Sequence, residues 1–328
     1  MTNKSLMIIN HCVPCGCACR HCFFCSRKAA PHGVPYEAGE RLALRFAQHG
    51  MPVSYAISHC ADYPELTRNI ALNRKLGFAG APFLQINGIA LRDQAALHEY
   101  LSQVQHAGVT TIDTTFYGTE AYHDNFAVRK GDFAFLCEII TTGLSLGLAM
   151  QPTFLATQEN ATQLSELIDT LTSLGCTSIY GFIQDYKGNG ETLEDMRLDQ
   201  AAYNNLPETV KQHLGVKHHK TQAQWLAAGE FAPPTERHLR LALRADNIAM
   251  LETMTCDDII GYLAGLDDAY HAALPTLPAL ATRYGDRGCP KLYRQRDLQW
   301  KWQKAHIKAQ NLALHDVTDE RNCGAIWR

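Results

Sequence analysis

The 328-residue chain lacks several features that would assign it to a class at once. It has no apolar run near the roughly 20 residues that a membrane-spanning helix needs. Its first residues, MTNKSLMIIN, contain too short an apolar stretch for a signal peptide and no small-residue cleavage site. Its 30 basic side chains nearly balance 33 acidic ones, which excludes a strongly basic nucleic-acid-binding protein. We therefore expect a cytoplasmic protein with neither a membrane nor a nucleic acid as partner.

Low-complexity segments are also missing, and the sequence shows no internal repeat beyond strand–helix units. The hydrophobic fraction of 46 % is ordinary for a globular protein, which excludes a disordered chain and a collagen-like fibre. The length is sufficient for one large core or two modest ones.

Cysteine, in contrast, is abundant, with 12 residues, six of which lie between positions 12 and 25. Without a secretory signal, a disulfide framework is the weaker interpretation, because the cytosol keeps thiols reduced. Clustered thiols in that compartment more often bind a metal, whereas isolated ones are mostly small buried hydrophobic residues. The cluster comprises Cys12, Cys15, Cys17, Cys19, Cys22 and Cys25; the isolated residues are Cys60, Cys137, Cys176, Cys256, Cys289 and Cys323.

Strand-like and helix-like patterns alternate over about the first two-thirds of the chain. One helical stripe, for example, places apolar residues at the i, i+3, i+4 and i+7 positions from Leu97. This alternation predicts right-handed βαβ units and a parallel sheet. Pro152 predicts a bulge or an irregular end in the fifth strand, and Asn160 is expected to be the N-cap of the next helix. The expected strands are 6–10, 53–58, 82–89, 110–116, 148–155 and 177–183, and the helices include 40–49, 65–76 and a long region ending near 147.

Six such units are too few for an eightfold barrel. They predict an α/β fold, a partial (β/α)6 TIM-like barrel, over residues 1–190. Residues 191–328 are less regular and are expected to form a mainly helical C-terminal extension that caps the barrel. Within it we expect a strand in 239–250 and helices in 257–274 and 292–311, the last packed on the barrel through Trp300 and Trp302. His218 and His219 lack the spacing of a metal site and are expected to be solvated or part of the core.

The cysteine cluster directly follows the first expected strand. In parallel α/β barrels the functional residues lie on loops at the carboxyl ends of the strands, so the cluster is expected on that face. Structural zinc sites usually combine two Cys-x-x-Cys pairs separated by roughly 12 to 20 residues. The pairs that begin at Cys12 and Cys22 are too close together for this arrangement.

Two iron–sulfur spacings can be compared with the cluster. The bacterial ferredoxin run begins at Cys19, but its fourth ligand position is Ala29. The other spacing, Cys-x₃-Cys-x₂-Cys, occurs once, at Cys15, Cys19 and Cys22. Three soft thiolate ligands close together on one loop suit an iron–sulfur cluster.

This spacing, on the loop after the first strand of a parallel barrel, resembles the radical SAM enzymes. In that superfamily three thiolates hold a [4Fe–4S] cluster and leave the fourth iron open to S-adenosylmethionine. The resemblance implies that Cys15, Cys19 and Cys22 are the cluster ligands. It also implies reductive cleavage of S-adenosylmethionine to a 5′-deoxyadenosyl radical, which abstracts hydrogen from a peptide or small-molecule substrate. Such an enzyme is oxygen-sensitive and needs an electron donor such as flavodoxin or ferredoxin.

The resemblance covers about residues 5 to 190. The passage TFYGTE at 115–120, followed by HD at 123–124 and RKGDF at 129–133, looks like one found in many radical SAM maturases. The chain departs from the family pattern at two places. The position before the third ligand is usually aromatic and here is His21. Where the family often has Gly-Gly-Glu to bind the ammonium group, Asp62 is the one candidate carboxylate.

The resemblance further implies a set of candidate S-adenosylmethionine contacts. Each has a structural alternative, such as plain strand packing for the threonines or a surface salt bridge for the arginine. No catalytic residue is assigned. The candidates are His21, Asp62, Thr114, Thr115, Tyr117, Arg129, Gln151 and Thr153.

One mode of substrate recognition is disfavoured, and two alternatives remain open. Residues 1–9 leave no room for a winged-helix segment, which argues against recognition of a leader peptide. An auxiliary cluster is a further alternative, formed either by Cys256, Cys289 and Cys323 or by the remaining cysteines of the N-terminal cluster. The competing class of function is a non-enzymatic thiolate metal-binding protein or iron–sulfur electron carrier.

Overall fold

The computed structural model describes residues 2–10, 15–22, 33–57, 61–77, 83–186, 188–230, 235–288 and 290–310, with side chains up to residue 306. Five of the cysteines lie outside the described residues: Cys12, Cys25, Cys60, Cys289 and Cys323.

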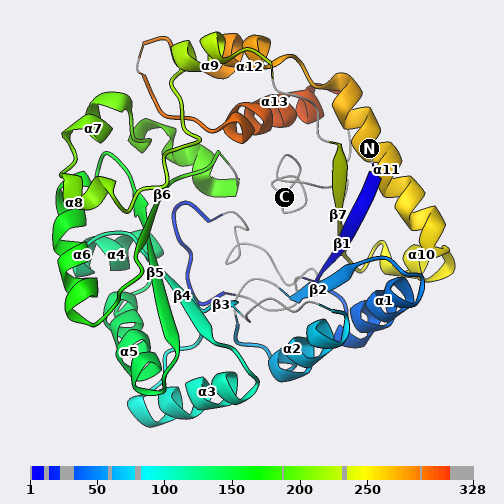
Figure 1. The fold of residues 1–328 in the computed structure, drawn as a ribbon, viewed down its shortest axis with the longest axis horizontal. Coiled ribbons are helices and arrows are strands. Elements are labelled where there is room, and N and C mark those ends of the chain that lie inside the picture. Colours follow the sequence, from blue (N-terminus) through cyan, green and yellow to red (C-terminus); the bar gives the residue numbers. More distant parts are fainter. Residues whose placement is uncertain are drawn as a thin grey trace.

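The described chain contains two parallel sheets, with the strand orders β2-β1-β7 and β3-β4-β5-β6. Figure 1 looks along the strands, which form an incomplete ring with helices on its outside. This arrangement confirms the predicted partial parallel barrel. The strands are β1 (Thr2–Asn10), β2 (Val53–Ile57), β3 (Phe83–Gln85), β4 (Thr111–Phe116), β5 (Ala149–Ala156), β6 (Tyr180–Ile183) and β7 (Glu236–Leu243).

The helices that follow the strands bury one face against them, as their periodicity predicts. In α1 the apolar face includes Leu42 and Phe46, both fully buried. Gly39 allows α1 to approach β2 closely, because a Cβ there would lie 2.2 Å from the Tyr55 ring. The helices of this half are α1 (Tyr36–Gln48), α2 (Leu66–Lys75), α3 (Gln94–His106), α4 (Glu120–Ala127), α5 (Asp132–Ser145), the short 3-10 turn η1 (Ala161–Gln163) and α6 (Leu164–Ser173).

Four local predictions differ from the structure. The expected 82–89 strand contains only β3, since a turn follows it, and the long helical region splits where Val128 adopts a left-handed conformation with φ of 55°. Pro152 forms no bulge, because β5 pairs with β4 through it without a register shift and pairs with β6 only from Thr153. Asn160 occupies the N-cap position of the 3-10 turn η1, but its side chain makes no capping hydrogen bond there. Its buried side chain instead bonds the backbone of Leu155 and Thr157.

The C-terminal extension contributes both helices and a strand. The strand predicted in 239–250 is β7, which ends at Leu243 and pairs in parallel with β1 over the whole length of β1. Figure 1 shows α13 between the β6 and β7 sides of the ring, with α9 and α12 outside it. Trp300 and Trp302 are both buried, but Trp302 packs with residues of α9, α11 and α12 and not in the core of either sheet, where the prediction placed it. The remaining elements are η2 (Gly188–Met196), α7 (Gln200–Asn205), α8 (Glu208–Lys211), α9 (Gln222–Ala228), α10 (Ile248–Thr253), α11 (Cys256–Ala273), α12 (Leu277–Tyr284) and α13 (Gln295–Gln310).

The hydrophobic core has two main parts, one for each sheet. The larger one packs β4, β5 and β6 against α3, α5 and α6, and the other packs β1, β2 and β7 against α1 and α11. A smaller cluster joins α9, α11, α12 and α13. Within the described ranges, no helix combines the length and the apolar content that crossing a bilayer requires.

Candidate functional site

The cysteine segment leaves β1 through a buried asparagine. The Asn10 side chain donates to the Val34 carbonyl at 2.8 Å and accepts from the Val34 N–H at 3.0 Å, and it also donates to the Tyr55 hydroxyl. These bonds join the point where the chain leaves β1 to the point where it enters α1. Asn10 therefore closes the base of the loop that carries the cysteines.

Backbone hydrogen bonds attach residues 16–22 to three neighbouring segments of the chain. Gly16 N donates to the carbonyl of Gly88 after β3, at 2.7 Å. Arg20 N donates to the Phe126 carbonyl in α4, and Asn189 N, in η2, donates to the Cys22 carbonyl, both at 3.0 Å. The loop is thus fixed at its beginning, middle and end by segments that follow β3, β4 and β6.

Gly88 is the tightest of these contacts. Its φ of 83° is one that glycine adopts readily. A Cβ at Gly88 would lie 2.0 Å from the Sγ of Cys15. The position of the first predicted ligand therefore depends on the absence of a side chain at residue 88.

A cavity of about 330 Å³ lies between the cysteine loop and the strands of the larger sheet. Its wall contains the three predicted metal ligands and side chains from β3 to β6. The lining residues are Cys15, Cys17, Cys19, His21, Cys22, Phe83, Gln85, Asn87, Asp113, Thr115, Tyr117, Thr153 and Phe182.

Asp113 is the one carboxylate among the described lining residues of this cavity. It is 6 % exposed, and its Oδ1 has no hydrogen-bond partner within the described part of the chain. Burial alone raises the pKa of Asp113 to about 7. The strand register places Gln85 and Gln151 on either side of it, on β3 and β5.

Two hydroxyl groups lie on the same face of the sheet, two residues further toward the carboxyl ends of the strands. The Oγ1 atoms of Thr115 and Thr153 are 3.0 Å apart, across the pair β4–β5. Asn87 holds this position, because its side-chain amide exchanges two hydrogen bonds with the backbone of Thr115. The cavity wall therefore presents a fixed row of polar groups.

His21 packs among aromatic rings. Its ring centroid is 5.1 Å from that of Tyr117, 5.7 Å from that of Phe126 and 6.3 Å from that of Phe182. Burial lowers the pKa of His21 to about 4, so the imidazole is neutral near pH 7. Burial likewise raises the pKa of the Tyr117 hydroxyl well above its ordinary value, with a further contribution from the thiol of Cys19.

A charged group supports the back of the cysteine loop. The Sγ of Cys17 lies 3.7 Å from both carboxylate oxygens of Asp132 and from one nitrogen of Arg129. Asp132 also pairs with Arg129 at 3.2 Å and with the buried His123 at 3.1 Å. The second arm of the Arg129 guanidinium donates to the Ile89 carbonyl at 2.7 Å. Through Asp132, Arg129 and His123, the cysteine loop is therefore connected to α4, to α5 and to the turn between them.

The structure brings only part of the predicted S-adenosylmethionine set together. His21, Thr115, Tyr117 and Thr153 line the cavity with the three cysteines. The other four candidates do not line it. Thr114 is fully buried on the opposite face of β4, Gln151 is half-buried on β5, Asp62 pairs with Arg92, and Arg129 pairs with Asp132.

Six lining residues were not among the predicted ligands and contacts: Cys17, Phe83, Gln85, Asn87, Asp113 and Phe182. Asp113 had a readable signal, because the run TTIDTTF places a carboxylate at the centre of an otherwise buried strand. Asn87 had none, because its role depends on the neighbouring strand.

The donor set of the cavity fits an iron–sulfur cluster. Cys15, Cys19 and Cys22 are partly exposed and line one cavity, and soft thiolates are the ligands that such clusters prefer. Among the described residues, no three His, Cys, Asp or Glu side chains meet closely enough to hold a single metal ion. A four-iron cluster does not require this, because each thiolate binds a different iron. The hydrogen bond with Cys17, together with burial, raises the pKa of Cys15, so binding iron there would release a proton.

The comparisons with known proteins concern the fold of the chain. No protein-family model matches the sequence, and no curated protein matches it. Two solved structures of SuiB from Streptococcus suis, bound to S-adenosylmethionine and to the precursor peptide SuiA, align with TM-scores of 0.51 and 0.52. Both alignments cover 73 % of this chain, at 13 % and 12 % identity. The chain therefore shares the partial parallel α/β barrel of these structures.

The alignment is partial on the side of the relatives. The chain spans 59 % and 58 % of the two SuiB chains. The coproporphyrinogen III oxidase HemN from Escherichia coli, described as a radical SAM enzyme, aligns with a TM-score of 0.42, 11 % identity and coverage of 65 % of this chain and 50 % of its own.

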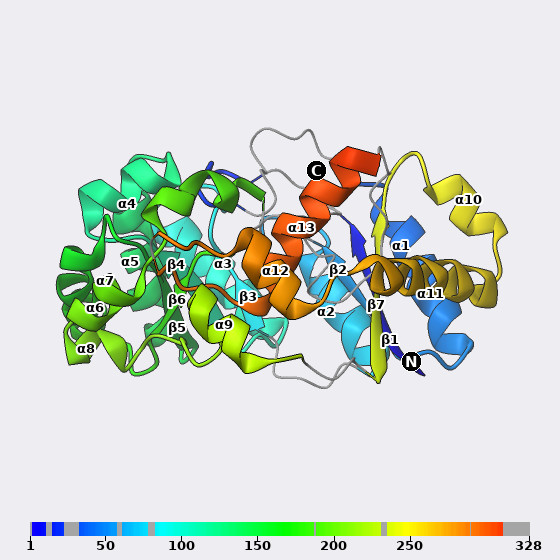
Figure 2. The ribbon, with the colours of Figure 1, turned by 90° about the horizontal axis from the view of Figure 1, so that it is seen from above.

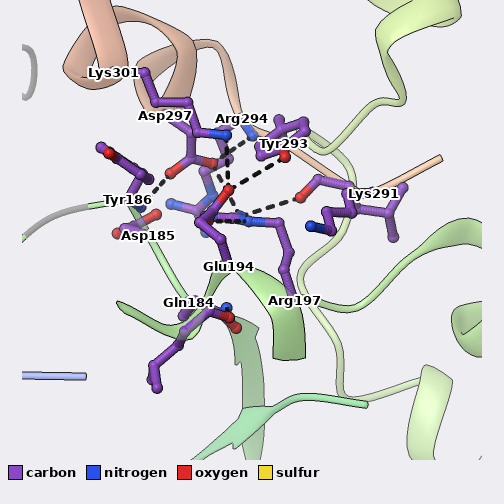
Figure 3. Close-up of polar contacts among 12 residues, drawn as sticks. Gln184, Asp185, Tyr186, Glu194, Arg197, Lys291, Tyr293, Arg294, Asp297 and Lys301 are labelled. Atoms are coloured by element: carbon purple, nitrogen blue, oxygen red, sulfur yellow. Dashed lines mark hydrogen bonds and ion pairs between the residues drawn. The ribbon is translucent and has the colours of Figure 1, made fainter. Parts of the chain in front are cut away.

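A buried ion network joins the segment after β6 to α13 (Figure 3). Arg197 is fully buried and pairs with Glu194 at 2.7 Å and with Asp297 of α13 at 3.4 Å. Glu194 also pairs with Lys301 at 2.7 Å. Asp297 accepts a hydrogen bond from Tyr186 N at 2.7 Å. Since η2 also bonds the Cys22 carbonyl, the C-terminal helix is connected to the third predicted ligand through one short segment.

Proposed function

We propose that this chain is a radical SAM enzyme. The observation that carries the proposal is the meeting of three thiols at Cys-x₃-Cys-x₂-Cys spacing, on the loop after β1, with one cavity of a parallel barrel. Cys15, Cys19 and Cys22 would hold a [4Fe–4S] cluster. With S-adenosylmethionine bound, such a cluster supplies the electron that yields a 5′-deoxyadenosyl radical, which abstracts a hydrogen atom from substrate.

The chain's own contribution is placement and exclusion of water. The aromatic wall around His21 offers a neutral, apolar surface on which a purine ring can stack. The hydroxyls of Thr115 and Thr153 offer hydrogen bonds to a ribose at the rim of the cavity. Asp113 lies on the same face of β4 as Thr115, two residues before it in the sequence and about 7 Å away along the strand. At that position it would face the substrate rather than the cofactor.

Four of the predicted contacts lie outside the cavity lining. Asp62 and Arg129 are both held in ion pairs away from the cavity lining. We assign Arg129 to the support of the cysteine loop, because it contacts Cys17 and Asp132. Asp62, Thr114 and Gln151 would reach S-adenosylmethionine only after local rearrangement.

The substrate would be a peptide or a small molecule. A solved SuiB structure of the same fold binds a precursor peptide, which favours the peptide class. A cytoplasmic location and a one-electron donor such as flavodoxin or ferredoxin belong to the same proposal. We assign residues 1–190 to the catalytic barrel and residues 191–328 to its extension, with β7 completing the sheet beside β1.

The competing function is a thiolate metal-binding or electron-carrying protein. The two functions differ in what the protein releases. An enzyme of this class, reconstituted with iron and sulfide without oxygen, releases 5′-deoxyadenosine when S-adenosylmethionine and dithionite are added. An electron carrier shows an iron–sulfur spectrum that S-adenosylmethionine does not alter, and releases no 5′-deoxyadenosine.

Cysteine variants test the ligand assignment directly. Replacing Cys15, Cys19 or Cys22 by Ala should each reduce 5′-deoxyadenosine formation to background. Cys137→Ala is the matched control, because Cys137 lies on α5 outside the cavity. An equal loss from Cys12→Ala would contradict the three-ligand assignment, since that cysteine is outside the spacing.

A further inference from the structure

A second groove lies outside the barrel cavity, between residues 217–220 and α9. Its volume is about 440 Å³, and it is open to solvent. In Figure 2, α9 lies toward the edge that holds the N terminus of β1, whereas the cysteine loop follows the opposite end of that strand. Among its described lining residues there is no carboxylate. The lining comprises Lys217, His219, Lys220, Gln224, Ala227 and Ala228.

His219 is the buried polar group of this groove. It is 7 % exposed, and neither of its ring nitrogens has a hydrogen-bond partner within the described ranges. Its backbone is fixed, because His219 N donates to the Val216 carbonyl at 2.8 Å. Buried polar groups are normally hydrogen-bonded, and leaving one without a partner costs about 1–3 kcal/mol. A ligand in the groove could supply the missing partner.

The largest charge effects on His219 come from cations. Arg294 exerts the strongest of them, followed by Arg197 and Arg296. The Nε of Arg294 is itself buried and has no hydrogen-bond partner in the described structure. Burial, reinforced by these cations, lowers the pKa of His219 to about 3, so its imidazole is neutral. Two of these cations are paired with carboxylates, Arg197 with Glu194 and Asp297, and Arg296 with Asp185.

Two lysines at the rim of the groove, Lys217 and Lys220, bring further positive charge. Neither Lys217 nor Lys220 forms an ion pair with any described residue, whereas Lys301 nearby pairs with Glu194. Lys220 is held in place, because its backbone exchanges two hydrogen bonds with Tyr293 and its ammonium lies 4.9 Å from the centroid of the Trp225 ring. The groove thus holds cationic groups without acidic partners.

We propose that this groove binds the phosphate group of a small phosphorylated molecule. Lys217 and Lys220, which both line the groove, together suit an anion with more than one negative charge better than a single carboxylate. Alanines 227 and 228 form an apolar wall, and the volume leaves space for the group attached to the phosphate. The inference does not depend on radical chemistry in the barrel.

The test is isothermal titration of the full chain with inorganic phosphate and with glycerol 3-phosphate. Lys217→Gln and Lys220→Gln should each weaken binding several-fold, and the double variant by about tenfold or more. Lys75→Gln is the control, because Lys75 is an exposed lysine on α2, distant from the groove, and should leave affinity unchanged. Lys217 is exposed, so its variant is expected to fold even if changes at the buried His219 do not.

The two ligands separate the possible sources of the phosphate. Tighter binding of glycerol 3-phosphate indicates a phosphorylated molecule, whereas equal binding of both indicates free phosphate, and either result supports a phosphate site. Absence of phosphate binding, unchanged affinity in the double variant, or equally tight binding of acetate would overturn the proposal.

Discussion

Replacing Asp113 by Asn tests the electrostatic character of the barrel cavity. The pKa of Asp113 rises from 3.8 to about 7 because of burial, and no charged group contributes to the change. Such an increase corresponds to about 4 kcal/mol of lost stability once the carboxyl group is fully ionised. Because the folded-state pKa is the higher one, the folded protein keeps its proton longer than the unfolded chain. Stability contributed by this group therefore falls as the pH rises from about 4 to about 7.

Asparagine has the shape of the carboxyl group but cannot ionise. The stability of Asp113→Asn relative to the wild type should increase by about 2–3 kcal/mol between about pH 5 and about pH 8.5. Urea denaturation at both pH values, on protein without added iron or S-adenosylmethionine, measures this difference. Effects of the amide that do not depend on pH cancel in the comparison.

A matched control is Asp258→Asn on α11. The side chain and backbone of Thr255 lower the pKa of Asp258, so this carboxyl group is ionised at both pH values and its replacement should show no change between them. If the stability difference between Asp113→Asn and the wild type is the same at both pH values, a cation or a water network compensates Asp113, and the reasoning about an uncompensated cavity carboxylate fails.

Two further substitutions test buried contacts, one beside the cysteine loop and one between η2 and α13. Gly88→Ala should prevent iron incorporation, because the new Cβ would meet the Sγ of Cys15. Gly50→Ala is the control, since Gly50 has a similar φ of 86° and no atom within 4 Å of the new Cβ. It should cost only about 1 kcal/mol of backbone strain and leave the iron content unchanged. Equal iron content in both variants would contradict the role of Gly88. Asp297→Ala should destabilise the protein by about 3 kcal/mol in urea denaturation, because it removes a buried carboxylate from the network of Figure 3. A loss of stability no larger than that caused by Asp258→Ala, at an exposed carboxylate, would contradict this prediction.

The sequence was a good guide to elements whose pattern is local. Strands such as β4 and β5 and the helices between them follow from apolar periodicity, and their positions agree with prediction within a few residues. The cysteine spacing is also local, which explains why three thiols could be assigned to one cavity. Strand alternation could have separated Thr114 from Thr115, because adjacent residues on a strand face opposite sides.

Other features depend on contacts between distant segments and have no local pattern. Arg197 and Asp297 are 100 residues apart, and the local sequence around each of them does not predict a buried ion pair. In the sequence Gly88 looks like an ordinary turn glycine, because its close contact with Cys15 depends on the three-dimensional fold. Asn10 likewise gives no sign that it closes the cysteine loop through Val34, 24 residues later.

The pairing of β7 with β1 has a consequence for how the chain reaches its native state. β1 comprises residues 2–10, yet its second neighbour, β7, is made of residues 236–243. Until that part of the chain has been synthesised, one edge of β1 has unpaired N–H and C=O groups, the type of edge that favours aggregation. Pairing across so long a separation is also slow. The strand that leads into the cysteine loop is therefore among the last to be completed, so stable cluster insertion should follow, rather than precede, synthesis of the C-terminal region.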